Sequence, residues 1–156
     1  MIEVTGNLWT YPADVRVITT NGTVKKNGEA VMGRGCALEA KQRHPTFPLY
    51  LGKQIRECGN VVLDCGFWGE GQVRLVTFPT KHNWYERSDL NLIRTSAIDL
   101  HQLVEILSWS YDWDTIVMPR PGCGNGGLKW ENVKPILVPI LDDRFHIITQ
   151  VYDVDR

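Results

Sequence analysis

The stretch Pro119-Arg-Pro-Gly-Cys-Gly-Asn-Gly-Gly-Leu-Lys-Trp130 follows a short apolar run, Thr115–Met118, and precedes a segment with the pattern of a helix. A buried strand that opens into a glycine-rich loop and then into a helix is how α/β proteins bring backbone N–H groups to a phosphate. A second glycine loop, Met32-Gly-Arg-Gly35, lies much earlier and also leads into a helix-like segment. Two such loops in one small domain indicate a ligand with more than one phosphate, held between them.

The chain has the size and composition of a single globular domain, which we expect to span residues 1–156. Its formal net charge of −1 argues against a large nucleic-acid footprint, which would need a basic face, but permits a short nucleic-acid end to enter a pocket. No apolar run approaches the roughly 20 residues of a membrane span, and the N-terminus does not resemble a signal peptide. We therefore expect a cytoplasmic monomer with no membrane partner.

Residue types that bind metals are scattered along the chain. The four cysteines lie at positions 36, 58, 65 and 123, and they show no CxxC or zinc-ligand spacing. The four histidines lie at positions 44, 82, 101 and 146. We therefore predict reduced thiols, no metal site and no cofactor.

Local patterns predict strands that alternate with helices. The expected strands are Ile2–Val4, Val15–Thr19, Val61–Cys65, Val73–Phe78, Thr115–Met118 and His146–Asp153. The expected helices are Cys36–Arg43, Pro48–Glu57, Leu90–Trp109 and Trp130–Leu141. Ser88 or Asp89 could cap the third helix, and Pro135 suits the last one only if the helix proper begins near it. Lys25–Arg34 and Pro79–Glu86 are expected to be loops. This alternation predicts an α/β fold, a three-layer α/β/α sandwich with a mixed central sheet.

Three sets of residues fall just after predicted strands: Asn21, Lys81 and the loop Gly122–Gly127. Ligands in such folds bind at the carboxyl ends of strands, so these residues could converge on one site. Plain structural explanations also exist. Lys81 could be a solvated surface charge, and Asn21 could cap a turn, as Asn-Gly often does. Cys123 could be a nucleophile with His82 as its base, although a small residue in a phosphate loop is the simpler explanation.

Three parts of the chain, taken in order, resemble the macro domain, a fold that binds ADP-ribose. The first part comprises Gly6–Leu8, Ala13–Asn21 and Val31–Leu38. The second is Thr77-Phe-Pro-Thr-Lys-His-Asn-Trp84, and the third is the glycine-rich stretch Pro119–Trp130. The resemblance spans roughly residues 4 to 153 and implies a macro-domain sandwich over the whole chain.

Within this family the chain looks most like the branch that holds the terminal ADP-ribose protein glycohydrolase and the macro-domain antitoxin that removes ADP-ribose from DNA. The segment Phe78–Lys81 carries this likeness, and it implies that Lys81 acts on the anomeric carbon of the distal ribose. The protein glycohydrolase has an aspartate where this chain has Gly126. The Gly-Asn-Gly-Gly sequence is closer to the DNA-directed antitoxin.

The resemblance also implies a set of binding residues. Asn7 stands where many macro domains carry an aspartate that hydrogen-bonds adenine, and its amide oxygen can still accept from an exocyclic amine. Tyr152 matches an aromatic residue that flanks the adenine, and Trp84 could cover the ribose. Lys81 and Asn21 are the implied catalytic residues. The implied ADP-ribose-binding residues are Asn7, Leu8, Thr20, Asn21, Met32, Gly33, Arg34, Gly35, Thr80, Gly122, Cys123, Gly124, Asn125, Gly126, Gly127 and Tyr152.

Three functions follow from this resemblance. The first is an ADP-ribosyl hydrolase that releases ADP-ribose from a modified macromolecule, DNA or a protein carboxylate, by lysine-assisted cleavage at C1″. The second is a non-catalytic reader of ADP-ribose, which the glycine at position 126 favours. The third is a phosphatase or deacetylase that acts on ADP-ribose 1″-phosphate or O-acetyl-ADP-ribose.

Overall fold

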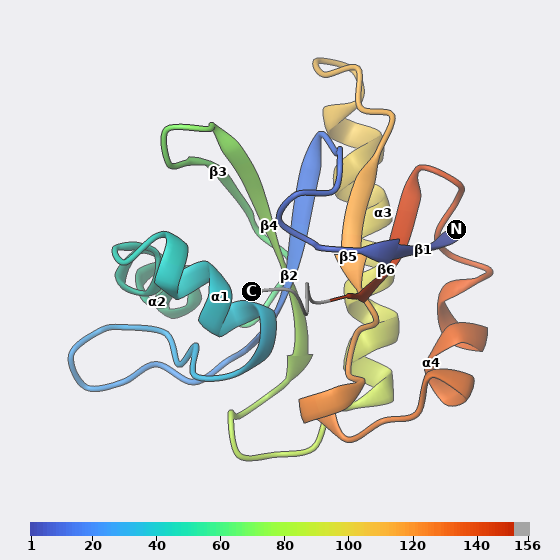
Figure 1. Ribbon diagram of the computed structural model, residues 1–156. Helices are drawn as coiled ribbons and strands as arrows, with labels where there is room; N and C mark the ends of the chain where they lie inside the picture. The colour runs from blue at the N-terminus through green and yellow to red at the C-terminus, as the bar shows by residue number, and fades with distance from the viewer. Residues whose placement is uncertain (152–156) are drawn as a thin grey trace.

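The computed structural model describes residues 1–151, which form a six-stranded sheet with helices on both faces (Figure 1). The strands are β1 (Ile2–Gly6), β2 (Val15–Asn21), β3 (Asp64–Trp68), β4 (Val73–Lys81), β5 (Ile116–Pro119) and β6 (Phe145–Gln150). The helices are α1 (Gly35–Arg43), α2 (Phe47–Cys58), α3 (Leu90–Leu107) and α4 (Trp130–Leu137), with a 3-10 turn, η1, at Gly124–Gly126. The strand order is β1-β6-β5-β2-β4-β3, and only the β3–β4 pair is antiparallel. The expected three-layer α/β/α sandwich with a mixed central sheet is confirmed.

Each face of the sheet buries its own apolar core, because successive residues of a strand point to opposite faces. In β5, Ile116 and Met118 pack with α3 and α4, whereas Val117 packs with α1 and α2 on the other face. In β6, Ile147 likewise packs on the face covered by α3 and α4, and Ile148 packs on the face covered by α1 and α2. Helices cover both faces, which explains why the parallel strands read as continuous apolar runs.

Helix α3 confirms one of the two expected caps, and it ends at Leu107, two residues before the expected Trp109. The Asp89 side chain accepts a hydrogen bond from the Asn91 N–H at 2.8 Å and caps the helix. Ile93, Ala97, Leu100 and Val104 are buried, whereas Leu92 is half-exposed. No helix within residues 1–151 is long and apolar enough to cross a bilayer.

The expected strand Val61–Cys65 is wrong in its bounds, because β3 runs from Asp64 to Trp68. The residues before Asp64 do lie along β4, but the Thr77 hydroxyl takes part in the contact: it accepts from the Leu63 N–H at 3.0 Å. Regular pairing begins at Asp64 and is interrupted before Phe67 by a shift in register. Sequence patterns do not reveal that a side-chain hydroxyl takes the place of a backbone acceptor between two strands.

The expected loop Pro79–Glu86 is also wrong at its start, because β4 continues through Pro79 and Thr80 to Lys81. A proline lacks an N–H and is normally excluded from a central strand. The Thr77 N–H points away from β2 and donates to Leu63 O. The Pro79 nitrogen, two residues later, therefore also points away from β2. Strand β3 pairs only with residues 73–76 of β4, so no ladder hydrogen bond is lost at Pro79.

The last two expected elements also change. Helix α4 runs from Trp130 to Leu137 and contains Pro135, rather than beginning near that proline and reaching Leu141. The carbonyl that Pro135 leaves without its usual donor belongs to Glu131, which is exposed and can be hydrated. Strand β6 starts one residue early, at Phe145, and ends at Gln150. The expected continuation to Asp153 lies outside the described residues.

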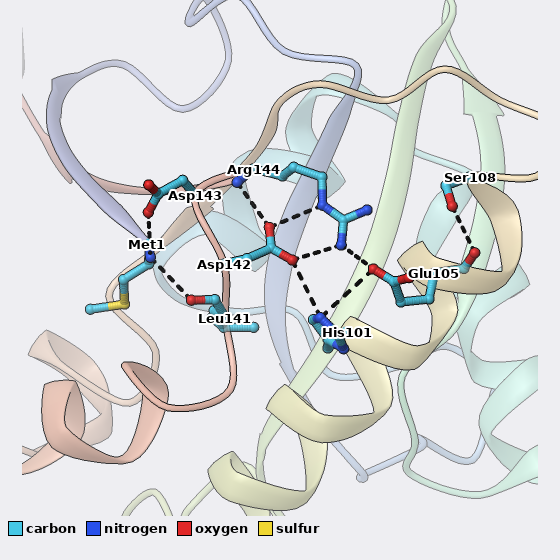
Figure 2. Close-up of polar contacts among 8 residues, drawn as sticks. All are labelled: Met1, His101, Glu105, Ser108, Leu141, Asp142, Asp143 and Arg144. Atoms are coloured by element: carbon cyan, nitrogen blue, oxygen red, sulfur yellow. Dashed lines mark hydrogen bonds and ion pairs between the residues drawn. The ribbon is translucent and has the colours of Figure 1, made fainter.

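An ion-pair network lies beside the amino end of β6, remote from the carboxyl ends of the strands (Figure 2). Arg144 donates to both oxygens of Asp142, at 3.0 and 2.7 Å, and also to Glu105 on α3. This hydrogen bonding holds the pKa of Asp142 at about 2. Within residues 1–151, His101, Glu105 and Asp142 are the one set of three potential ligands close enough for a metal ion. The Arg144 cation already pairs with both carboxylates, so this cluster is an ion-pair network.

Candidate functional site

A cavity of about 680 Å³ lies at the carboxyl ends of the central parallel strands. Residues from the ends of β2, β4, β5 and β6 line it, together with both glycine loops and the start of α1. Twelve of the sequence-predicted residues line this cavity: Leu8, Thr20, Asn21, Gly33, Arg34, Gly35, Thr80, Lys81, Gly122, Cys123, Asn125 and Gly126. Asn7, Met32 and Gly124 do not line it, Gly127 lines an adjoining hollow, and Tyr152 lies outside the described residues.

The side chains of Asn21 and Lys81 come from neighbouring strands. A shift in register near the ends of β2 and β4 pairs Thr20 with Pro79 but Asn21 with Lys81. The Asn60 amide donates to the Lys81 carbonyl at 2.9 Å and fixes the backbone there. The bulge therefore sets the lysine beside the asparagine at the edge of the cavity.

Lys81 Nζ lies between two backbone carbonyls, 3.4 Å from that of Asn125 and 3.5 Å from that of Trp84. The Asn125 carbonyl belongs to the late glycine loop, Gly122–Gly127, and the Trp84 carbonyl belongs to the loop after β4. These long hydrogen bonds keep the amino group at the mouth of the cavity without an ion pair in residues 1–151. An amino group held there can stabilise a leaving group or attack an electrophilic carbon.

Asn21 has a structural role beside any role toward a ligand. Its Nδ2 donates to Val31 O at 3.0 Å, and its Oδ1 accepts from the Thr23 N–H at 2.9 Å. The first bond ties the end of β2 to the segment before the early glycine loop. One N–H of the amide and one lone pair of its oxygen remain for a ligand.

The early glycine loop ends at the N-terminus of α1. Arg34 is the N-cap residue, no side chain caps the helix, and its first turn has no acidic residue. Gly35, Cys36 and Ala37 line the cavity, so the positive end of this helix faces it. A Cβ placed on Gly35 would lie 3.4 Å from Asn125 Nδ2, so the two glycine loops approach each other across the cavity. The arrangement suits an anion with several oxygens, such as a diphosphate.

The late glycine loop is packed against the start of α3. At Gly122 (φ 77°) a Cβ would lie 2.7 Å from Ile93 Cδ1 and 2.9 Å from Leu128 Cδ1. At Gly126 a Cβ would overlap the Ser88 hydroxyl oxygen. The positive φ of Gly122 favours glycine there, and a Cβ at Gly126 would force the Ser88 hydroxyl to move.

Cys123 and His82 do not pair with each other. His82 Nε2 lies 2.8 Å from Asp89 Oδ2, and this hydrogen bond is the main reason that the pKa of Asp89 is lowered. Burial raises the pKa of the Cys123 thiol, which makes it a poorer nucleophile. The cysteine is thus a small residue in the loop, consistent with the simpler explanation.

Several polar residues of the cavity wall were missed by sequence reasoning, among them Gln150 and Ser88. Gln150 Oε1 accepts from the Leu8 N–H at 3.0 Å, and its Nε2 is buried without a partner in residues 1–151. Ser88 is 6% exposed, and its Oγ is likewise unpartnered among those residues. By contrast, Asn7 Oδ1 accepts from the Trp9 N–H at 2.8 Å, outside the cavity. A polar residue at the end of the last parallel strand was the signal that could have revealed Gln150.

The position of Ser88 gives a testable expectation for Gly126. We expect Gly126→Asp to lower the free energy of unfolding by about 1–3 kcal/mol, because the new Cβ overlaps Ser88 Oγ. Combining it with Ser88→Ala removes that oxygen and should restore part of the loss. Thermal unfolding of the four proteins in the double-mutant cycle measures this coupling. A Gly126→Asp variant as stable as the wild type would contradict the packing described.

The fold and its cavity define a class of protein: an α/β/α ligand-binding domain with an anion cradle between two glycine loops. No family model matches the chain. The DNA ADP-ribosyl glycohydrolase of Mycobacterium tuberculosis is 35% identical to it over 118 residues, which are 72% of this chain and 32% of that relative. The DNA ADP-ribosyl glycohydrolase of Thermus aquaticus is 30% identical over 155 residues, which are 96% of this chain and 40% of that relative. The chain thus spans about a third of the length of these curated relatives.

Solved structures match nearly the whole chain. The macrodomain of Mycobacterium tuberculosis DarG has a TM-score of 0.77 at 28% identity, and the match covers 97% of both chains. The macrodomain of Thermus aquaticus DarG has a TM-score of 0.72 at 28% identity, with the same coverage. The chain belongs to the macro-domain family, as the three sequence segments indicated. Thermosipho africanus DarTG in complex with ADP-ribose, with a TM-score of 0.72 at 20% identity, shares the fold.

Proposed function

We propose that this macro domain binds ADP-ribose in its main cavity and hydrolyses the bond between C1″ of the distal ribose and a DNA base. One observation carries the proposal: Lys81, Asn21 and both glycine loops line a single cavity. The names of the DNA ADP-ribosyl glycohydrolases of Mycobacterium tuberculosis and Thermus aquaticus support DNA as the substrate.

The ligand is expected to lie with its diphosphate between the two glycine loops, near the uncapped N-terminus of α1. Asn21 then contacts the hydroxyl groups of the distal ribose, and Lys81 lies beside its anomeric carbon. The adenine end points toward Leu8 and Gln150, where the free Nε2 can donate to a ring nitrogen. Gln150 therefore replaces Asn7 as the expected contact of the base.

In the overall reaction, water supplies the oxygen that replaces the attached base on C1″, and the base leaves with a proton from that water. Lys81 either stabilises the negative charge on the departing base or attacks C1″ itself, after which water releases the ribose. The proposal includes no metal or organic cofactor, because Lys81 supplies the required charge. The proposed reaction needs one copy of the chain only. It suits the cytoplasm, where free thiols such as those of the four cysteines stay reduced.

The test is ADP-ribose release, measured by mass spectrometry, from three substrates: ADP-ribosylated single-stranded DNA, glutamate-linked ADP-ribosyl protein and O-acetyl-ADP-ribose. We expect fastest release from DNA, with no change when a chelator is added. Fastest release from the protein or from the acetyl ester would assign a different linkage and overturn the DNA proposal.

The second candidate function is a non-catalytic reader of ADP-ribose. It is favoured by Gly126, which stands where the terminal ADP-ribose protein glycohydrolase has an aspartate and where a Cβ would meet the Ser88 hydroxyl. Two results together would establish that the protein is a reader. Calorimetry would show that the folded protein binds ADP-ribose, and mass spectrometry would show no release of ADP-ribose from any of the three substrates.

A further inference from the structure

A second, shallower hollow of about 300 Å³ adjoins the main cavity. The two share Arg34, Lys81, Trp84, Asn125 and Gly126 in their walls. Lys81 therefore lies at the boundary between them. If the distal ribose fills the main cavity beside Lys81, the group attached to C1″ must lie on the other side of this lysine, in the second hollow.

Two aromatic side chains form an exposed wall of this hollow. Trp84 is 51% exposed and Tyr85 is 70% exposed, and their ring centroids lie 5.7 Å apart in an edge-to-face arrangement. Adjacent exposed aromatic residues often mark a surface that binds a ligand or partner. Exposed rings beside a cavity are the means by which proteins hold unpaired nucleobases, because every base has a face that can stack.

Hydrogen bonds tie the loop that carries these rings to the rest of the fold. The Trp84 N–H donates to Thr23 Oγ1 at 3.1 Å, and the Glu86 N–H donates to Asn83 O at 3.1 Å. Further along, the Ser88 N–H donates to Gly126 O at 2.9 Å, which ties the loop to the glycine-rich stretch. A platform held in this way loses little conformational entropy when a base stacks on it.

The charge of the hollow suits a phosphate. Arg34 and Arg87 line it, and neither forms an ion pair with any residue in positions 1–151. Arg87 Nη2 donates to Gly127 O at 2.8 Å, which leaves further N–H groups of its guanidinium for a ligand. The one carboxylate of the wall, Glu86, accepts from Asn83 Nδ2 at 2.7 Å. Together with Lys81, the two arginines put three cationic groups in the wall of the hollow against one carboxylate, although the net charge of the chain is −1.

We propose that the second hollow is the leaving-group subsite and that it holds single-stranded DNA, with a base stacked on Tyr85, the more exposed of the two rings, and a phosphate near Arg87. This inference rests on the proposed function. A single strand is required because a base within a duplex cannot reach Lys81 without leaving the stack. A protein carboxylate offers neither an aromatic face for the rings nor a phosphate for the arginines.

The test compares kcat/KM for two substrates with the same linkage: an ADP-ribosyl nucleoside and a short single-stranded oligonucleotide with one ADP-ribosylated base. We expect Tyr85→Ala to lower the oligonucleotide-to-nucleoside ratio of kcat/KM about tenfold, because one stacking contact is lost. Tyr85→Phe retains the ring and should restore the ratio. Trp109→Ala is the matched control, because Trp109 is 92% exposed and follows the C-terminal end of α3, whereas the hollow lies near its start.

Salt supplies an independent readout of the phosphate contact. With one phosphate near Arg87, the log of the oligonucleotide-to-nucleoside ratio of kcat/KM should fall with log salt with a slope of about −0.7. Arg87→Gln should reduce that slope by about 0.7. A wild-type enzyme with equal kcat/KM for nucleoside and oligonucleotide, or a ratio unchanged in Tyr85→Ala, overturns the subsite while the proposed function stands. Absence of release from both substrates overturns the proposed function itself.

Discussion

Lys81→Ala is expected to lower the rate of ADP-ribose release from DNA by about a hundredfold to a thousandfold, the usual effect of removing one group that stabilises developing charge. The reason is geometric. Lys81 lies at the boundary of the two cavities, so its amino group is near both C1″ and the departing base in the proposed binding mode. No other lysine lines the boundary within residues 1–151.

The affinity for ADP-ribose separates catalysis from folding in this variant. Lys81 Nζ makes only two long hydrogen bonds, to the carbonyls of Asn125 and Trp84, so its removal should leave the cavity intact. Calorimetric titration with ADP-ribose should therefore give a Kd within a few-fold of the wild type. Lys53→Ala, on the exposed side of α2, controls for the loss of a positive charge. Full turnover by Lys81→Ala would refute the catalytic role.

Borohydride distinguishes the two chemical roles of Lys81. If Nζ attacks C1″ and an imine forms with the opened ribose, hydride from borohydride reduces it to a stable secondary amine. The protein then carries the mass of the ribose-containing fragment on Lys81. If Nζ only stabilises the departing base, no adduct accumulates under the same conditions, and Lys81→Arg should keep part of the activity because a cation remains.

The sequence revealed the parts of the fold that depend on local pattern. Parallel strands covered on both faces, such as β2 and β5, read as short apolar runs between polar loops, and their bounds were correct within two residues. The glycine-rich stretch after β5 was recognisable because a close backbone approach needs glycine wherever it occurs. These features sufficed for the fold and for most of the residues around the cavity.

Features that depend on contacts between distant residues were not visible. The pairing of Asn21 with Lys81 follows from a register shift between two strands separated by about 60 positions, and no local pattern records it. Pro79 belongs to a strand only because β3 stops short of it. The Asn7 side chain is engaged by its own turn, so Gln150, far away in sequence, supplies the polar group near Leu8. Each is a tertiary effect that overrides a local preference.

A further tertiary effect concerns a glycine inside α2, Gly52. In an exposed helix interior, glycine to alanine stabilises by about 1 kcal/mol. Here we expect the opposite: Gly52→Ala should lower the free energy of unfolding by about 3 kcal/mol. A Cβ on Gly52 would overlap the Gly28 carbonyl oxygen and lie 2.9 Å from the Ala30 nitrogen. These are backbone atoms, which cannot move aside as a flexible side chain can.

The same contact links stability to the site. The Ala30 N–H donates to Pro48 O at 2.8 Å at the start of α2, so a shift of this segment would also displace the Gly33–Gly35 loop that follows it. We therefore expect weaker ADP-ribose binding together with a melting temperature lowered by about 10 °C. Gly71→Ala is the matched control, because no atom lies within 4 Å of its Cβ position, and it should change stability by less than about 0.5 kcal/mol. A Gly52→Ala protein that is more stable than the wild type would show that α2 does not pack on residues 28–30 in this way.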